Sequence, residues 1–302
     1  MSIHLGDCMD GMKSLADNSI DVVITDPPYF LDGLCNNWSK EGIDKKGSSK
    51  CISNLPKGMK FDKKQTIKFR EFYTNFSKEV FRVLKPGGAF LSFSSPRLYH
   101  ALGTAVDEAG FEIRDMMGWI YTQSQVKSFS QDHIIQNDKK MSQEQKDDLK
   151  MFCRNWKTPQ LKPAIEPICI AVKPIEGRYI DNFAKYGVGL VNFGEETKVG
   201  TKTITPSNIV TTENITEDLD KVFLVDKPNK AEKGEGNTHL SVKPVKLIEH
   251  LIKLFTREGA LVMDPFMGSG TTAVAANNTG RGYIGWETNE EYHTIAMSRT
   301  QP

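Results

Sequence analysis

Four residues near the start of the chain could together hold a flat ring that carries an exocyclic amine. They are Asp26, Pro27, Pro28 and Tyr29. Each proline lacks a backbone N–H and fixes φ at about −65°, so the chain here is a stiff, extended edge with carbonyl acceptors. Asp26 and the Pro27 carbonyl can accept the two amine hydrogens, and Tyr29 can stack on the ring. Taken alone, these residues also fit a strand that ends in a proline-rich turn, with Asp26 as a helix cap.

A second group of candidate residues lies near the end of the sequence. Residues 260–263 predict a buried strand, Gly268 and Gly270 a tight turn, and Thr271 the start of a helix. Small residues let the backbone approach a nucleoside, and a helix N-terminus favours the negative end of a ligand. Glu287 ends the next predicted strand, at a distance that suits a clamp on a ribose diol. A turn made only for packing is the alternative, and the lack of Gly-Lys-Ser/Thr argues against a P-loop.

Strand and helix patterns alternate along the chain, which predicts an α/β protein with a doubly wound, mostly parallel, Rossmann-like sheet. Asp7 and Asp26 both follow predicted strands, and ligands bind at the C-terminal ends of strands in such sheets. We expect strands 111–121 and 168–172 to form an antiparallel hairpin at one edge. Residues 3–8 predict a short strand and a turn. The other predicted strands are 22–24, 89–93, 260–263 and 283–287, and the predicted helices are 9–15, 69–84, 97–109, 142–151, 245–258 and 290–299.

The bulk composition is that of an ordinary globular protein. The 302 residues suit one large domain with insertions, or two domains, and the net charge of +1 means that any polyanion-binding surface must be local. Five cysteines without a CxxC spacing argue against a disulfide framework and against a zinc site, and fit a reducing cytoplasm. We see no leader, no membrane-spanning run and no internal repeat.

In two regions the hydrophobic residues show no clear helical or strand periodicity. Residues 31–70 contain ten basic and four acidic residues, interleaved with Trp38 and Phe61. A solvated loop and a loop that contacts DNA phosphates are both compatible with this composition. Residues 178–236 hold scattered aromatic residues and many Gly, Thr and Asn residues, which suggests a small inserted lobe or long loops.

Both motifs, in this order, resemble the β class of S-adenosylmethionine-dependent DNA amino-methyltransferases, of bacterial and bacteriophage type, whose motifs are circularly permuted. Asp26–Tyr29 is similar to the catalytic motif, and residues 264–272 are similar to the cofactor motif. Residues 239–244 resemble the segment that precedes the cofactor motif, and residues 6–8 the strand end that faces the cofactor adenine. Lys85–Gly88 and residues 161–168 match further segments of the family.

The resemblance implies a site for each substrate. Asp26, Pro27, Pro28 and Tyr29 would be catalytic. The residues implied on the cofactor side are Asp7, Cys8, His239, Ser241, Lys243, Asp264, Phe266, Gly268, Ser269, Gly270, Thr271 and Glu287. Asp7 would hold the adenine amine and Glu287 the ribose hydroxyls. Lys243 is a candidate for the methionine carboxylate, or else a solvated lysine before a helix, and His239 is expected to be structural rather than a catalytic base.

The implied activity is methylation of the N6 amine of a flipped adenine in double-stranded DNA, with S-adenosylhomocysteine as the second product. The acid at position 26 favours adenine N6, and cytosine N4 is the alternative. Methylation of RNA or of a protein amide would require an Asn at position 26 and the reverse motif order. A non-catalytic DNA-binding homologue is a further alternative. A cognate restriction endonuclease and a homodimer are left open as partners.

This resemblance also divides the chain. Residues 1–30, 67–174 and 237–302 would form the catalytic domain. Residues 31–66 would form a basic loop that contacts DNA, and residues 175–236 a target-recognition region. We expect a cytoplasmic protein without membrane contact and without a bound metal.

Overall fold

The computed structural model describes residues 1–28, 63–121, 128–159, 161–194, 197–199, 202–211, 223–225, 228–233, 237–239 and 242–301. The chain divides into two compact units. The larger unit combines Met1–Trp119 with Glu166–Pro302, and the smaller unit is Ile120–Ile165. The predicted basic loop lies almost entirely outside the described residues.

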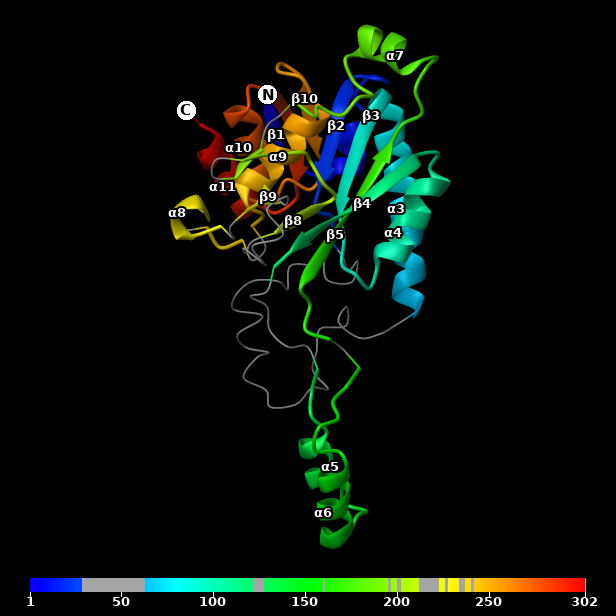
Figure 1. The fold of residues 1–302 in the computed structure, drawn as a ribbon, viewed down its shortest axis with the longest axis vertical. Coiled ribbons are helices and arrows are strands. Elements are labelled where there is room, and N and C mark those ends of the chain that lie inside the picture. The colour runs from blue at the N-terminus through cyan, green and yellow to red at the C-terminus, as the bar shows by residue number, and fades with distance from the viewer. Residues whose placement is uncertain are drawn as a thin grey trace. The chain divides into compact units, whose positions relative to one another are not determined.

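Within the described residues, a nine-stranded sheet organises the larger unit (Figure 1). Its strands follow the order β1-β11-β10-β2-β3-β5-β4-β8-β9. They are β1 (Ser2–Leu5), β2 (Ile20–Thr25), β3 (Leu84–Phe93), β4 (Glu112–Ile120), β5 (Ile165–Val172), β8 (Ile209–Thr211), β9 (Phe223–Leu224), β10 (Leu261–Asp264) and β11 (Gly282–Glu287). Neighbours from β1 to β3 pair in parallel, and β5 runs antiparallel to β3. A separate antiparallel pair consists of β6 (Thr197–Val199) and β7 (Lys202–Ile204).

This topology confirms the predicted α/β architecture. The predicted neighbours β4 and β5 lie side by side, and the short strands β8 and β9, which the sequence pattern did not reveal, extend the sheet beyond β4. Every residue of β2 is buried. That burial explains its apolar, β-branched sequence, because a parallel strand is covered by helices on both faces.

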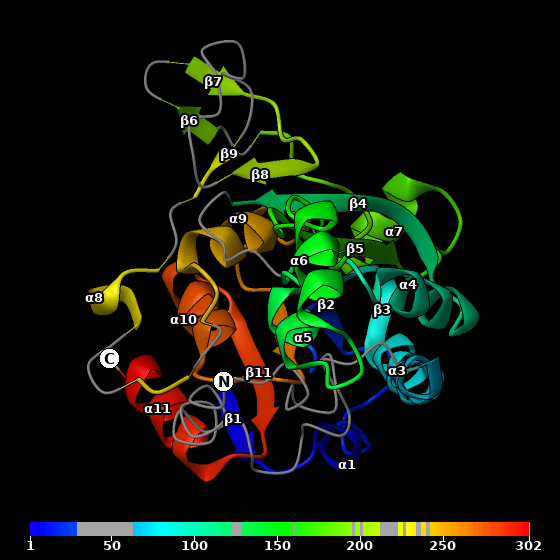
Figure 2. The ribbon, with the colours of Figure 1, turned by 90° about the horizontal axis from the view of Figure 1, so that it is seen from below.

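Helices cover both faces of the sheet, as Figure 2 shows. One group, which packs with a core that includes Phe90 and Trp286, contains α1 (Cys8–Met12), α3 (Lys63–Val83) and α4 (Tyr99–Glu108). The opposite group contains α9 (Val245–Phe255), α10 (Thr271–Asn278) and α11 (Glu290–Thr300). Two further helices of this unit are α7 (Tyr179–Tyr186) and α8 (Lys230–Lys233).

The amphipathic pattern of α3 places one face in the core. Its fully buried apolar residues, spaced three or four apart, are Phe69, Tyr73, Phe76, Val80 and Val83, and Ser77 is buried among them. The predicted helix 69–84 is therefore confirmed, although α3 begins earlier, at Lys63, and the Tyr73 hydroxyl forms a hydrogen bond with the buried Ser92 side chain.

Residues Lys85–Gly88 separate the predicted helix 69–84 from the predicted strand 89–93, but in the structure they are part of β3. The pairing of β3 with β2 shifts register between Ile20 and Val22, so the chain bulges here without leaving the sheet. Glycine permits this bulge, because Gly87 has a φ of 81° and a Cβ on Gly88 would lie 3.0 Å from the Asp21 carbonyl oxygen.

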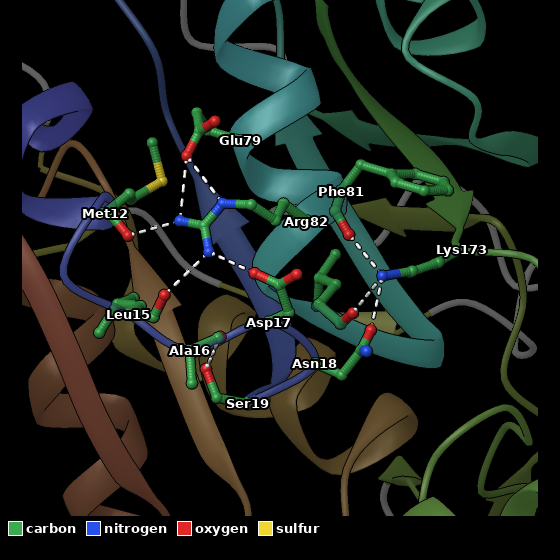
Figure 3. A network of polar contacts seen from close by, with 11 residues as sticks. Met12, Leu15, Ala16, Asp17, Asn18, Ser19, Glu79, Phe81, Arg82 and Lys173 are labelled. Atoms are coloured by element: carbon green, nitrogen blue, oxygen red, sulfur yellow. Dashed lines mark hydrogen bonds and ion pairs between the residues drawn. The ribbon is translucent and has the colours of Figure 1, made fainter.

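Two basic side chains fix the loop that leads into β2 (Figure 3). Arg82, at the end of α3, donates to Asp17 at 2.7 Å, to the Leu15 carbonyl of the loop and to the Met12 carbonyl at the end of α1. Lys173, directly after β5, donates to Asn18 at 2.7 Å and to the Leu84 carbonyl at 2.8 Å. These bonds join the entry to β2 with α3, β3 and the end of β5, so they help to position the strand that carries Asp26.

The smaller unit is a helical hairpin of α5 (Asp132–Asn137) and α6 (Gln143–Phe152). Ser142 and Gln145 form a capping box at the start of α6, which agrees with the predicted helix. Apolar contacts are few, since α6 has no buried residue and Ile135 is the buried residue of α5.

Candidate active site

The catalytic motif continues directly from β2. Thr25 is the last residue of the strand and is buried, Asp26 is partly exposed, and Pro27 is buried. Pro28 is partly exposed, and Tyr29 lies outside the described residues. The strand therefore ends with a carboxylate at the C-terminal edge of the sheet, as the sequence predicts.

The glycine-rich turn lies beside this motif although about 240 residues separate the two. Strands β10 and β2 are parallel neighbours, with Val262 opposite Val22. The Thr25 hydroxyl donates to Asp264 Oδ1 at 2.8 Å, a buried bond across 239 positions of sequence. One hydrogen bond thus connects the residue before Asp26 with the first residue of the cofactor motif.

Asp264 organises the turn itself. Its Oδ2 accepts the Thr272 hydroxyl at 2.6 Å, and its Oδ1 also accepts the Phe266 N–H at 3.1 Å. Burial raises the pKa of Asp264 to about 6, although these hydrogen bonds oppose the rise. Asp264, predicted to belong to the cofactor motif, therefore has a structural role here: its carboxylate accepts hydrogen bonds from protein groups that hold the turn.

Gly268 and Gly270 have positive φ angles of 54° and 85°. A Cβ on Gly268 would lie 3.0 Å from His239 Nε2, and His239 packs edge-on against Tyr292 with ring centroids 4.6 Å apart. Burial lowers the pKa of His239, which favours the neutral imidazole of a packing residue. Ser241, from the same predicted segment, lies outside the described residues.

Hydrogen bonds from Arg299, a residue of α11, stabilise the rest of the turn. Arg299 donates to the Ser269 carbonyl at 2.7 Å and to the Thr271 hydroxyl at 3.4 Å. Ser269 and Thr271 are both buried. Phe266 is partly buried and packs against Phe76 of α3, with ring centroids 5.2 Å apart.

Glu287, at the end of β11, is the group best suited to a ribose diol. Its carboxylate accepts the Gly268 N–H at 2.9 Å and the Asn289 N–H at 2.8 Å. A carboxylate has about four acceptor positions, so Glu287 keeps capacity to accept from ribose hydroxyls. Burial raises the pKa of Glu287. The donor set and the small residues of the turn therefore fit a nucleoside such as that of S-adenosylmethionine.

Asp7 and Cys8 lie at the adjacent end of β1, whose residue Leu5 pairs with Glu287. Asp7 is exposed and caps α1 by accepting the Met9 N–H at 2.7 Å. The Cys8 side chain is buried in the core, and burial raises the pKa of its thiol to about 12. Asp7 is thus placed where a ligand amine could be bound, whereas Cys8 could contribute only its backbone.

Lys243 points to the catalytic side of the site. Its Nζ contacts Asp26 Oδ2 and lies 2.9 Å from Glu166 Oε1. The predicted contact with a methionine carboxylate stays a prediction, since this ammonium is already bound by two protein carboxylates.

Sequence reasoning gave no role to Glu166, Thr25 or Arg299. Glu166 belongs to the segment 161–168 that resembles the family, and this resemblance was the available signal, because the predicted strand began only at residue 168. The partners of Thr25 and Arg299 are 239 and 30 residues away, so no local pattern could reveal them.

In the part of the chain that the structure describes, no cluster of three His, Cys, Asp or Glu residues could hold a metal ion. No helix among these residues is long and apolar enough to span a bilayer.

The fold is that of known DNA methyltransferases. The M1.HpyAVI complex with S-adenosylmethionine covers 100% of this chain and 99% of its own, with a TM-score of 0.55 at 20% identity. The cytosine-N4-specific PvuII DNA methyltransferase covers 100% and 86%, with a TM-score of 0.59 at 18% identity. The parallel sheet, the acidic strand ends and the glycine-rich turn define a Rossmann-like methyltransferase that uses S-adenosylmethionine.

The sequence comparisons are more specific. A family model of N6 and N4 methyltransferases, described as DNA methylase, matches residues 20–298. Type II methyltransferase M.HindIII of Haemophilus influenzae is 28% identical over 319 residues, which cover 98% of this chain and 94% of that relative. Type II methyltransferase M2.DpnII of Streptococcus pneumoniae is 26% identical over 293 residues, with 96% and 85% covered. The chain belongs to the DNA methylase family, and its substrates are DNA and S-adenosylmethionine.

Proposed function

We propose that this protein methylates the N6 amine of adenine in double-stranded DNA. The observation that carries the proposal is the Thr25–Asp264 hydrogen bond, which joins the end of β2 to the glycine-rich turn. Asp26, the next residue, therefore lies beside a site suited to the methyl donor. An acid at this position is typical of adenine-N6 members of the family.

The catalytic strategy follows from the chemistry of the amine. Its lone pair is delocalised into the ring, so the nitrogen is a poor nucleophile in its planar form. Hydrogen bonds to Asp26 and to the Pro27 carbonyl favour a pyramidal nitrogen and stabilise the positive charge that develops on it. S-adenosylmethionine supplies an electrophilic sulfonium methyl group and is converted to S-adenosylhomocysteine.

The base must leave the duplex before this geometry can form, because its amine is otherwise paired within the stack. In the proposal, Tyr29 stacks on the flipped adenine. Glu287 holds the ribose hydroxyls of the donor, and Asp7 holds its adenine amine. Residues 31–66 contact phosphates, and residues 175–236 read the target sequence.

The proposal extends to the biological setting. Relatives named as type II methyltransferases support a role beside an endonuclease that cuts the same sequence. The enzyme would then act in the cytoplasm, where the cellular DNA lies. Genomic DNA from cells that produce the active protein should resist that endonuclease.

Mass spectrometry of nucleosides from methylated DNA tests the chemistry. We expect N6-methyladenine with the wild-type protein, none with Asp26→Ala, and a normal amount with the surface control Asp10→Ala. S-adenosylmethionine binding should be retained in Asp26→Ala, because Asp26 contacts the amine rather than the donor. N4-methylcytosine as the product would overturn the adenine assignment, and near-normal turnover of Asp26→Ala would overturn the catalytic one.

A further inference from the structure

Lys243 joins three neighbouring strands at the catalytic edge of the sheet. Its ammonium contacts Asp26 after β2 and lies 2.9 Å from Glu166 in β5. It also lies 5.0 Å from the ring centroid of Phe93, the last residue of β3. Because β5 is antiparallel to β3, the start of β5 and the end of β3 lie together. The ammonium is therefore directed to the acceptor that the proposed reaction uses.

The cluster is largely shielded from water. The exposed fraction of the side chain is 11% for Lys243, 16% for Glu166 and 23% for Asp26. A shielded ammonium is stable only when it is paired and hydrogen-bonded. Burial lowers the pKa of Lys243, but the two carboxylates outweigh burial and raise it above its ordinary value. Lys243 is accordingly a permanent cation at neutral pH.

We propose that Lys243 and Glu166 are positioning residues for Asp26. Lys243 holds one oxygen of the Asp26 carboxylate, so that the carboxylate keeps a single orientation toward the target amine. Glu166 holds Lys243 in turn. This inference rests on the proposed function, since it takes Asp26 as the group that binds the amine.

The charges of the cluster explain the need for a second carboxylate. Asp26 and Lys243 alone would be neutral, and Lys243 would oppose the positive charge that develops on the amine nitrogen. With Glu166, the three ionised groups sum to −1. As the nitrogen lone pair forms the bond to the methyl carbon, the bond between that carbon and the sulfonium sulfur breaks, and its electron pair stays on the sulfur of S-adenosylhomocysteine. The net negative cluster stabilises the positive nitrogen until it releases a proton to water.

Steady-state and binding measurements on two variants test this assignment. We expect Lys243→Met to lower kcat about 100-fold, at the low end of the range for removal of one preorganised electrostatic group. Glu166→Gln should lower kcat about tenfold, because Glu166 acts only through Lys243. The Kd for S-adenosylmethionine should change less than about twofold in both, because neither residue is assigned to the donor. Lys243→Arg should recover part of the lost rate, since the cation is restored. Lys246→Met, which removes an exposed lysine of α9, is the matched control and should behave as wild type.

The outcomes separate this inference from the proposed function. Normal turnover of Asp26→Ala, which removes the acceptor, would refute the proposed function itself. Loss of turnover in Asp26→Ala, with normal kcat in both Lys243→Met and Glu166→Gln, would refute only the positioning roles. A large loss of S-adenosylmethionine affinity in Lys243→Met with kcat retained would assign Lys243 to the donor carboxylate and overturn the inference. Thermal melting establishes that each variant is folded, and Glu166→Gln provides the test if Lys243→Met is not.

Discussion

Replacing Asp264 with asparagine should change how the stability of the protein depends on pH. Asp264 is only 4% exposed and accepts three hydrogen bonds from Thr25, Phe266 and Thr272. Burial raises its pKa from 3.8 to about 6. The folded protein therefore binds this proton more tightly than the unfolded chain does.

The direction and size of the effect follow from linkage. A raised carboxyl pKa stabilises the fold fully below pH 3.8, and that stabilisation is lost as the pH rises through about 6. At 1.36 kcal/mol for each pH unit between the two pKa values, the loss is about 3 kcal/mol. Asparagine cannot ionise, yet its carbonyl oxygen can still accept from Thr25 and Phe266, so Asp264→Asn should lack this loss.

Urea unfolding between pH 4 and pH 8 measures the effect. The free energy of unfolding of wild type, minus that of Asp264→Asn, should fall by about 2 kcal/mol from pH 4 to pH 7, because at pH 4 the unfolded carboxyl is already partly ionised. Other carboxylates titrate equally in both proteins and cancel in the difference. Asp10→Asn, at an exposed position, is the control for removal of a carboxylate. A difference that stays constant across this range would refute the reasoning.

Three further predictions concern ligand binding. Glu287→Gln should weaken S-adenosylmethionine binding by about 1–2 kcal/mol, because a neutral amide accepts the ribose hydroxyls less strongly, and unchanged calorimetric affinity would exclude the ribose role. Gly268→Ala should weaken the same binding by a similar amount, about 1–2 kcal/mol, because the residue has positive φ and its Cβ would collide with His239. Adding His239→Ala to this variant should restore only the part of the affinity that is lost through the collision, since the strain of the positive φ remains. Neutralising the lysines between Lys40 and Lys68 should reduce the salt dependence of DNA affinity, and an identical slope in a salt titration would leave this segment without phosphate contacts.

The placement of the two motifs was accessible from sequence because each follows a strand of strongly apolar residues. Strand C-terminal ends meet at one edge of a parallel sheet, so Asp7, Asp26 and Glu287 could be placed at that edge before the structure was known. The structure bears out that placement, and the roles of these residues stay predictions.

Long-range side-chain contacts were not accessible in the same way. From the sequence, Lys243 is either a solvated lysine or a residue that binds the methionine carboxylate of S-adenosylmethionine. A local pattern does not reveal that Asp26 and Glu166 both contact it. The sequence of Lys85–Gly88 predicts only the end of a helix, because Pro and Gly commonly follow a helix C-terminus. Only the pairing with β2 shows that the segment stays in the sheet.

The strand order also has a consequence for biosynthesis. β1 is synthesised about 280 residues before its partner β11, and β10 and β11 separate β1 from β2. During translation β1 therefore stays unpaired, and β2 keeps an open edge, until β10 and β11 have been made. The glycine-rich turn after β10 and Glu287 at the end of β11 are made equally late, so these residues can assemble beside Asp26 only after β11 has been synthesised.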